Sequence, residues 1–151
     1  MTTATYQAPF GALTLVADGD ALVAVHLDGD PAAPPPRGVL ARVARQLDEY
    51  FARTRTAFEL PLAAPGTDFQ RAVWAALVAI PFGETRSYVD IARAVGRPTA
   101  SRAVGAANGQ NPIAIIVPCH RVIGASGALT GYAGGLERKR WLLAHEGALL
   151  L

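Results

Sequence analysis

A short segment rich in proline divides this chain into two parts with different sequence patterns. The segment reads Leu60-Pro61-Leu62-Ala63-Ala64-Pro65-Gly66. Each proline lacks a backbone N–H and has a restricted φ, so neither a helix interior nor a central strand can run through this stretch. We therefore expect a linker here, and two domains that comprise residues 1–62 and residues 63–151.

The N-terminal part has the pattern of a small α+β domain. Apolar residues from Phe10 to Asp28 flank a turn at Asp18-Gly19-Asp20, which predicts an antiparallel hairpin. The proline-dense stretch Pro31 to Pro36 is predicted to be a loop. From Val39 to Arg53, apolar residues recur at steps of three and four, as in an amphipathic helix. These patterns predict a small antiparallel sheet and one helix.

The C-terminal part is predicted to be mainly helical. Thr67-Asp68 can cap a helix that is ended by the breaker Pro81 to Thr85. The stretch from Gly124 to Gly135 contains five glycines and is predicted to be a loop. Leu136 to Ala144 is a predicted terminal helix, with Gly147 at its C-terminal cap.

Two short helices in this part are joined by a turn that contains glycine. Ser87 caps the first, Tyr88 to Val95, and Gly96-Arg97-Pro98 leads to the second, which begins at residue 99 or 100 and ends near Asn108. The pattern is typical of a winged-helix-like helix-turn-helix, although many helix pairs that bind no DNA share it. Most side chains of the second helix are small, and Arg102 is its lone large polar residue. Such a helix suits close approach to DNA or to a neighbouring helix.

The composition limits the class of protein. The chain has 151 residues, of which 51% are hydrophobic and 17% charged, so it is long enough and apolar enough for a buried core. A single cysteine excludes an internal disulfide and a zinc site with several cysteines. No apolar run reaches transmembrane length, and the N-terminus lacks the pattern of a signal peptide. We expect a cytoplasmic protein with no metal and no membrane partner.

Charge is distributed unevenly along the chain. Residues 1–64 contain five basic and seven acidic residues, whereas residues 86–140 contain eight basic and two acidic residues. Such an imbalance is typical of a region that binds a polyanion such as nucleic acid. The alternative is a solvated basic surface without a partner.

The single cysteine, Cys119, follows the apolar run Ile113 to Val117, which predicts a buried strand. A thiolate is a strong nucleophile, and the adjacent His120 is a candidate base. Neighbours on a strand point to opposite faces, so contact requires a tight turn or a bridging water. Glu146 is a candidate to orient His120. The alternatives are that Cys119 is a buried structural residue and that Glu146 is a solvated carboxylate.

The sequence Pro118-Cys119-His120-Arg121-Val122 resembles the active-site signature of the O6-alkylguanine-DNA alkyltransferases, also called methylated-DNA–protein-cysteine methyltransferases. The resemblance is strong over about residues 64–147 and loose over residues 1–60. Other segments resemble blocks of the same family in the same order: Phe69-Gln70-Arg71-Ala72-Val73-Trp74, Phe82-Gly83, Ser87-Tyr88, Ser101-Arg102-Ala103-Val104-Gly105, Asn111-Pro112, Gly131-Tyr132-Ala133-Gly134-Gly135 and Trp141-Leu142-Leu143-Ala144-His145-Glu146-Gly147.

The resemblance implies DNA repair by direct reversal. In this family, a cysteine takes the alkyl group from O6-methylguanine in double-stranded DNA irreversibly, once per molecule; O4-methylthymine is left open as a second substrate. The alkyl group is already on the DNA, so no cofactor is expected. The N-terminal part lacks the cysteines with which some relatives bind zinc. We expect a monomer, with cooperative binding along DNA left open.

The resemblance also implies the roles of individual residues. The catalytic residues would be Cys119 as the nucleophile, His120 as the base acting through a water, Glu146 as its polarising partner, Asn111 as the holder of the active-site turn, and Tyr88 as a contact to the flipped guanine and the adjacent backbone. The second helix would enter the minor groove with Ala100, Ser101, Arg102, Ala103 and Gly105, Arg102 filling the gap in the base stack. The base would be held by main-chain groups of Cys119, Val122 and Ala133, with Tyr132 and Gly134 in the pocket wall.

Two alternative functions remain at this point. An alkyltransferase-like sensor would bind and flip the damaged base without repairing it, but such proteins replace the nucleophile, and Cys119 is present here. A helix-turn-helix regulator would read the major groove with polar side chains, which the second helix almost entirely lacks.

Overall fold

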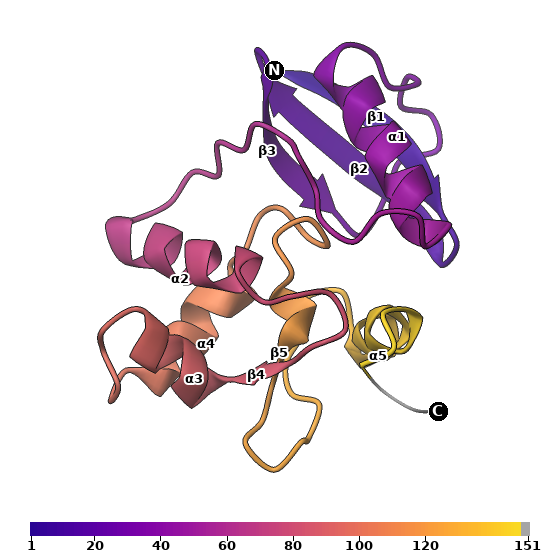
Figure 1. The fold of residues 1–151 in the computed structure, drawn as a ribbon. Helices are drawn as coiled ribbons and strands as arrows, with labels where there is room; N and C mark the ends of the chain where they lie inside the picture. The colour runs from indigo at the N-terminus through magenta and orange to yellow at the C-terminus, as the bar shows by residue number, and fades with distance from the viewer. Residues whose placement is uncertain (149–151) are drawn as a thin grey trace. The chain divides into compact units, whose positions relative to one another are not determined.

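A computed structural model describes residues 1–148 of the chain. Two compact units are present, and their positions relative to one another are not assigned (Figure 1). One unit contains residues 1–65 together with Pro112–Ala114; the other contains residues 66–111 and, within the described chain, residues 115–148. The predicted domains, residues 1–62 and 63–151, remain a proposal, and the sequence did not predict the return of residues 112–114 to the first unit.

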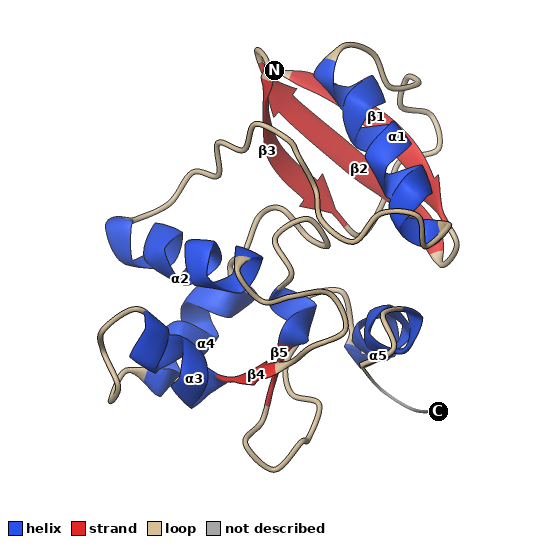
Figure 2. Ribbon diagram, in the orientation of Figure 1, coloured by secondary structure: helices blue, strands red, loops and turns tan. Residues whose placement is uncertain are grey.

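The N-terminal unit is an antiparallel sheet covered by one helix (Figure 2). Its strands β1 (Thr2–Ala8), β2 (Gly11–Asp18) and β3 (Ala21–His26) follow one another in the sheet in chain order. The helix α1 (Val39–Phe51) packs against all three strands. The predicted hairpin and helix are therefore confirmed. Strand β1 was not predicted, because alanines on its buried face make the alternation weak.

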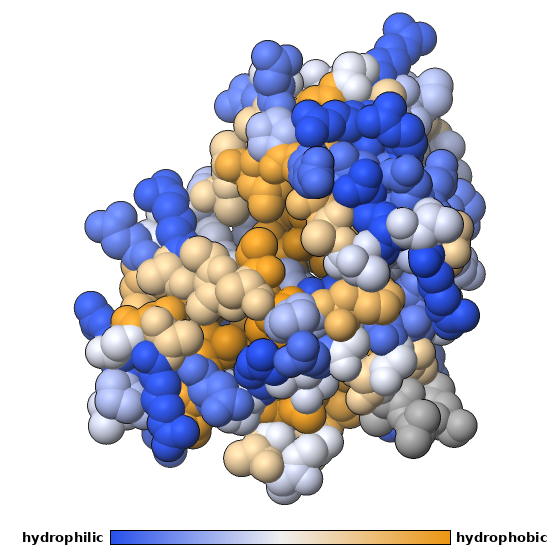
Figure 3. Space-filling model, in the orientation of Figure 1, coloured by the Kyte–Doolittle hydropathy of each residue, from blue (hydrophilic) through white to orange (hydrophobic). Residues whose placement is uncertain are grey.

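The core of this unit lies between α1 and the sheet. Helix α1 contributes completely buried side chains at steps of three or four, and β2 contributes Leu13 and Leu15. The hydroxyl of Tyr6 on β1 donates a hydrogen bond of 2.7 Å to Asp48 on α1. The outer face of α1 is hydrophilic (Figure 3), as expected for an amphipathic helix on a sheet.

The C-terminal unit is built mainly from helices. They are α2 (Asp68–Val78), α3 (Tyr88–Ala94), α4 (Ser101–Gly109), the single 3₁₀ turn η1 (Cys119–Arg121) and α5 (Leu136–His145). Two short strands, β4 (Arg86–Ser87) and β5 (Val122–Ile123), pair in parallel. Helices α2, α3 and α4 pack against one another, and Trp74 on α2 donates a hydrogen bond of 2.9 Å to the carbonyl of Ala107 on α4.

Local sequence signals explain where these helices begin and turn. Thr67 and Gln70 form a reciprocal capping box at the start of α2, and Ser87 and Asp90 form another at the start of α3. Gly96, between α3 and α4, has a φ of 75°, a region that favours glycine. The predicted helix-turn-helix and fold class are confirmed. Within residues 1–148, no helix is long and apolar enough to cross a membrane.

The predicted strand from Ile113 to Val117 is wrong. Only Ile113 pairs, in an isolated parallel bridge to Val25, and turns follow it. Ile115 has a φ of 70°, which is strained for a β-branched residue and costs about 1–3 kcal/mol. The run is apolar because all of it is buried, and burial without periodicity does not distinguish a strand from a buried turn.

Removal of the cap of α2 tests how much this helix depends on its first turn. We expect Thr67→Ala to lower the free energy of unfolding by about 1 kcal/mol, because the amide of Gln70 loses its 3.1 Å acceptor. Urea denaturation followed by circular dichroism measures the change. Thr56→Ala, at an exposed turn, is the control; an equal loss in both variants would contradict a specific contribution from the cap.

Candidate active site

Cys119 lies in a turn that asparagines at the end of α4 hold in place. The amide of Cys119 donates to the carbonyl of Val117 at 2.8 Å, which closes a tight turn before η1. The side-chain amide of Asn111 donates to the same carbonyl, also at 2.8 Å. That of Asn108 reaches the carbonyl of Cys119 at 3.4 Å. The chain around the thiol is thus fixed by side chains as well as by its own backbone.

The thiol of Cys119 is buried. Burial raises its pKa, while a hydrogen bond from Asn111 and the positive charge of Lys139 act in the opposite direction without cancelling the effect. The resting group is therefore a neutral thiol, and its use as a nucleophile requires a base.

His120, Arg121 and Glu146 form a buried, hydrogen-bonded cluster, and the first two directly follow Cys119 in the sequence. His120 Nε2 lies 2.8 Å from Glu146 Oε2. Arg121 binds both oxygens of the same carboxylate, with Nε 2.8 Å from Oε1 and a terminal nitrogen 3.0 Å from Oε2. The guanidinium also donates to the carbonyl of Ile80 at 2.6 Å. The structure thus brings Glu146 from the end of α5 to His120 on η1. Its burial rules out the alternative that Glu146 is a solvated carboxylate.

The charges in this cluster determine the protonation states of Glu146 and His120. Burial alone would raise the pKa of Glu146, but His120 and the permanent cation of Arg121 lower it to about 2. Burial lowers the pKa of His120, although Glu146 opposes the shift. A neutral His120 donates from Nε2 to the carboxylate and therefore carries its lone pair on Nδ1. Nδ1 is the nitrogen available as a base.

Three buried polar atoms in this unit lack a hydrogen-bond partner within the described residues: Asn108 Oδ1, His120 Nδ1 and Tyr132 Oη. Buried polar atoms are nearly always satisfied, by protein, water or ligand. Burial and then the proximity of Cys119 raise the pKa of Tyr132 well above its usual value, so its hydroxyl remains a donor. These atoms can receive a bridging water and the polar edge of a substrate.

The residues predicted to bind DNA lie on or next to α4. Ala100 is its N-cap residue; Arg102 and Ala103 are exposed, while Ser101 and Gly105 are partly exposed. Gly105 faces the ring of Tyr88, the first residue of α3, because a Cβ built on Gly105 would lie 3.7 Å from Cδ1 and Cε1 of that ring. The exposed side of α4 is therefore nearly free of large side chains except for Arg102.

The residues predicted to bind the base lie on β5 and on the loop that follows it. Val122 is buried on β5, and its carbonyl accepts a hydrogen bond of 2.6 Å from Lys139 Nζ. Tyr132, Ala133 and Gly134 lie on the loop before α5.

No individual role was predicted for Arg121 or Lys139 from the sequence: Arg121 was noted within the cysteine signature, and both were counted in the basic charge. Lys139 precedes the buried Leu142 and Leu143 by three and four residues, so helical spacing indicates its inward position. No comparable signal marks the burial of Arg121.

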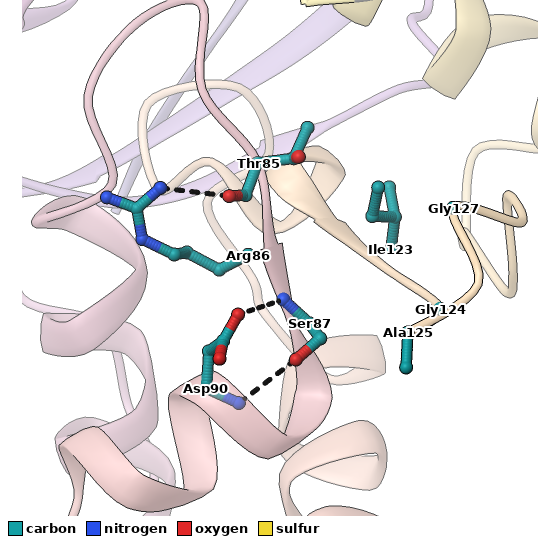
Figure 4. A pocket seen from close by; sticks show the side chains of 8 residues that line it. All are labelled: Thr85, Arg86, Ser87, Asp90, Ile123, Gly124, Ala125 and Gly127. Atoms are coloured by element: carbon teal, nitrogen blue, oxygen red, sulfur yellow. Dashed lines mark hydrogen bonds between the residues drawn. The ribbon is translucent and has the colours of Figure 1, made fainter.

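A pocket of about 220 Å³ lies between the start of α3 and the turn after β5 (Figure 4). None of its lining residues is a predicted catalytic residue. They are Thr85, Arg86, Ser87, Asp90, Ile123, Gly124, Ala125 and Gly127. In the part of the chain that the structure describes, no group of three or more His, Cys, Asp or Glu side chains could hold a metal ion.

The fold and the site define a protein with a helix-turn-helix and a buried cysteine that precedes a histidine paired with a carboxylate. The family described as 6-O-methylguanine DNA methyltransferase matches both parts of the chain: its ribonuclease-like domain matches residues 1–64, and its DNA-binding domain matches residues 68–148. The chain belongs to this family.

Similar proteins carry the corresponding activity in their names. A methylated-DNA–protein-cysteine methyltransferase of Mycobacterium tuberculosis is 52% identical over 148 residues, which cover 94% of this chain and 90% of the relative. One from Methanosarcina acetivorans is 48% identical over 152 residues, covering 96% of this chain and 97% of the relative. The crystal structure of the Mycobacterium tuberculosis OGT in complex with DNA has a TM-score of 0.89 and 51% identity, covering 98% of this chain and 94% of that one.

The ion pair of Glu146 is expected to make stability depend on pH. Its folded pKa of about 2 lies below the ordinary value of 4.5, so its contribution is complete above pH 4.5 and is lost as the pH falls through about 2. At pH 7, Glu146→Gln should cost about 3–5 kcal/mol, because Arg121 stays buried without its counter-charge.

Urea denaturation at several pH values measures both effects. The variant should lose less stability than the wild type between pH 4.5 and 2. Glu137→Gln, an exposed carboxylate on α5, is the control. Parallel pH profiles for wild type and Glu146→Gln would contradict the assignment.

Proposed function

We propose that this protein repairs O6-methylguanine in double-stranded DNA by moving the methyl group irreversibly to the sulfur of its own Cys119. The observation that carries the proposal is the buried thiol beside the His120–Glu146 pair in a chain that belongs to a DNA methyltransferase family. The same chemistry would apply to O4-methylthymine as a second substrate.

The transfer would proceed through a base-assisted displacement. Nδ1 of His120 accepts the thiol proton of Cys119 through a water, and Glu146 stabilises the imidazolium that forms. The thiolate attacks the methyl carbon. An S–C bond forms as the C–O bond breaks, and the electron pair of that bond stays on the base. A proton, delivered with the help of Tyr88, restores guanine.

The product explains why one molecule would act once. The sulfur becomes part of a thioether, which has no good leaving group under these conditions, so Cys119 is not regenerated. The methyl group comes from the DNA itself, and the reaction therefore needs no methyl donor or other cofactor. Asn111 would keep the active-site turn in place throughout, through its bond to the carbonyl of Val117.

The target base must leave the duplex, because its reacting atom is inaccessible inside the stack. The nearly bare exposed side of α4 suits close contact with the minor groove, through Ala100, Ser101, Ala103 and Gly105. Arg102 is the one long side chain there and would fill the space left by the base. Phosphate contacts from the basic C-terminal part would add affinity that is independent of sequence.

The flipped base would be held mainly by the backbone. The carbonyls of Cys119 and Val122 and the amide of Ala133 would contact its polar edge, with Tyr132 and Gly134 in the wall. The carbonyl of Val122 already accepts from Lys139, but a carbonyl oxygen has a second lone pair for the base.

The sensor function is not favoured. The relatives carry the name of the methyltransferase, and Cys119 with a formed histidine–carboxylate pair is what a repair protein needs. We further propose that the protein acts as a monomer and is cytoplasmic, where reducing conditions protect a single essential thiol.

Intact-protein mass spectrometry tests the transfer. After incubation with a duplex that carries one O6-methylguanine, the wild type should gain the mass of one methyl group, saturating at one per molecule. Peptide mapping should place it on Cys119, the nucleophile.

Cys119→Ser and an undamaged duplex are the controls, and neither should yield the added mass. Tight lesion-specific binding without any mass gain would replace repair by sensing. Binding without preference for the lesion would favour a regulator.

The pH dependence of transfer tests the role of His120. Its pKa is lowered from the ordinary 6.5 by burial, so the neutral base persists at neutral pH and the rate constant should fall only below pH 6.5. His120→Gln should lower the rate constant roughly 10²–10⁴-fold and remove that fall.

Single-turnover quench-flow with the methylated duplex measures the rate constants. The exposed His26→Gln in the N-terminal unit is the matched control and should keep the wild-type profile. An unchanged rate constant in His120→Gln would show that another group accepts the proton.

A further inference from the structure

Thr130, on the loop between β5 and α5, is held from two sides. Lys139 Nζ donates a hydrogen bond of 2.6 Å to its carbonyl. Its hydroxyl lies 2.8 Å from the hydroxyl of Tyr88, the first residue of α3. We refer to Tyr88, Thr130 and Lys139 as the Thr130 clamp. Residues 130 and 88 are far apart in sequence, so this contact joins the loop to the helix-turn-helix.

Lys139 makes the backbone of Thr130 a fixed point. The side chain of Lys139 is completely buried, and its ammonium group divides its hydrogen bonds between the carbonyls of Thr130 and Val122. A buried charge is retained only where such bonds compensate for lost hydration. The carbonyl of Thr130 is therefore tied to β5, next to the Cys119 turn, although the surrounding loop is exposed and rich in glycine.

Tyr88 receives its orientation from two neighbours. The ring lies against the backbone of Gly105 on α4, which restricts its position from one side. Its hydroxyl is bound by Thr130. A phenol ring of this kind has two side-chain torsions, and a contact at the ring together with a contact at the oxygen restrains both.

We propose that Thr130 is a positioning residue for alkyl transfer, which orients the Tyr88 phenol toward the flipped base. The inference rests on the proposed function and adds a residue to it. A threonine hydroxyl can donate to the Tyr88 oxygen, and in that arrangement the phenol keeps its own proton for the guanine. The loop that would form the pocket wall and α3 of the helix-turn-helix then share one hydrogen bond.

The size of the effect follows from the loss of one neutral hydrogen bond. A typical bond of this kind corresponds to roughly a three- to tenfold change in a rate or equilibrium constant. Thr130→Val keeps the shape of the side chain and the carbonyl bound by Lys139 but removes the hydroxyl. We expect Thr130→Val to slow methyl transfer by about that factor. Thr130→Ser, which keeps a hydroxyl, should transfer at close to the wild-type rate.

A double-mutant cycle separates positioning from a structural effect. Single-turnover rate constants with the O6-methylguanine duplex are measured for wild type, Thr130→Val, Tyr88→Phe and the double variant. If Thr130 acts through the Tyr88 hydroxyl, Thr130→Val should have little further effect in the Tyr88→Phe background. Equal slowing in both backgrounds, or none in either, would overturn the proposal.

Ser126→Ala, on the exposed part of the same loop, is the matched control and should transfer at the wild-type rate. Lesion binding is measured separately in the Cys119→Ala background, where we expect Thr130→Val to change affinity less than it changes the rate. A larger loss of affinity than of rate would assign Thr130 to DNA binding instead. Absence of transfer by the wild type would refute the repair function itself, an outcome distinct from a failure of the Thr130 clamp.

Discussion

The carboxylate of Glu146 is the group on which the organisation of the site depends. It lies just after α5 and binds His120 and Arg121 of η1, so one side chain joins the last helix to the turn that carries the thiol. It also sets the chemistry, because it accepts from Nε2 of His120 and leaves the lone pair on Nδ1. Position and protonation of the base thus have the same cause.

Buried charge in the C-terminal unit serves organisation more than stability. Glu146, Arg121 and Lys139 are all buried, and removing ions from water costs more than simple pairing returns unless every polar atom is satisfied. Here the two cations bind backbone carbonyls as well: Ile80 for Arg121, and Val122 and Thr130 for Lys139. These bonds hold the backbone at Ile80, Val122 and Thr130 to two buried side chains, whereas a purely apolar core would offer no directional contacts of this kind.

The sequence was informative where local chemistry determines structure. The capping residues Thr67 and Ser87 and the turn at Gly96 placed the helices of the C-terminal unit, and the resemblance brought Cys119, His120 and Glu146 together. Prediction from the sequence failed where tertiary contacts determine the local structure. Ile113 to Val117 is apolar through burial and forms turns. The inward position of Arg121 and the pairing of Tyr88 with Thr130 depend on contacts between residues distant in sequence. A single sequence contains no local signal for such contacts.

The return of Pro112–Ala114 to the N-terminal unit affects how this unit folds while the chain is being synthesised. The amide of Val25 on β3 donates to the carbonyl of Pro112 at 2.9 Å, and the carbonyl of Val25 accepts from Ala114 at 3.3 Å. During translation, the edge of β3 therefore stays without these partners until residue 114 has left the ribosome. A gene cut at the linker would yield a first fragment with an open sheet edge, which is the kind of surface that promotes aggregation.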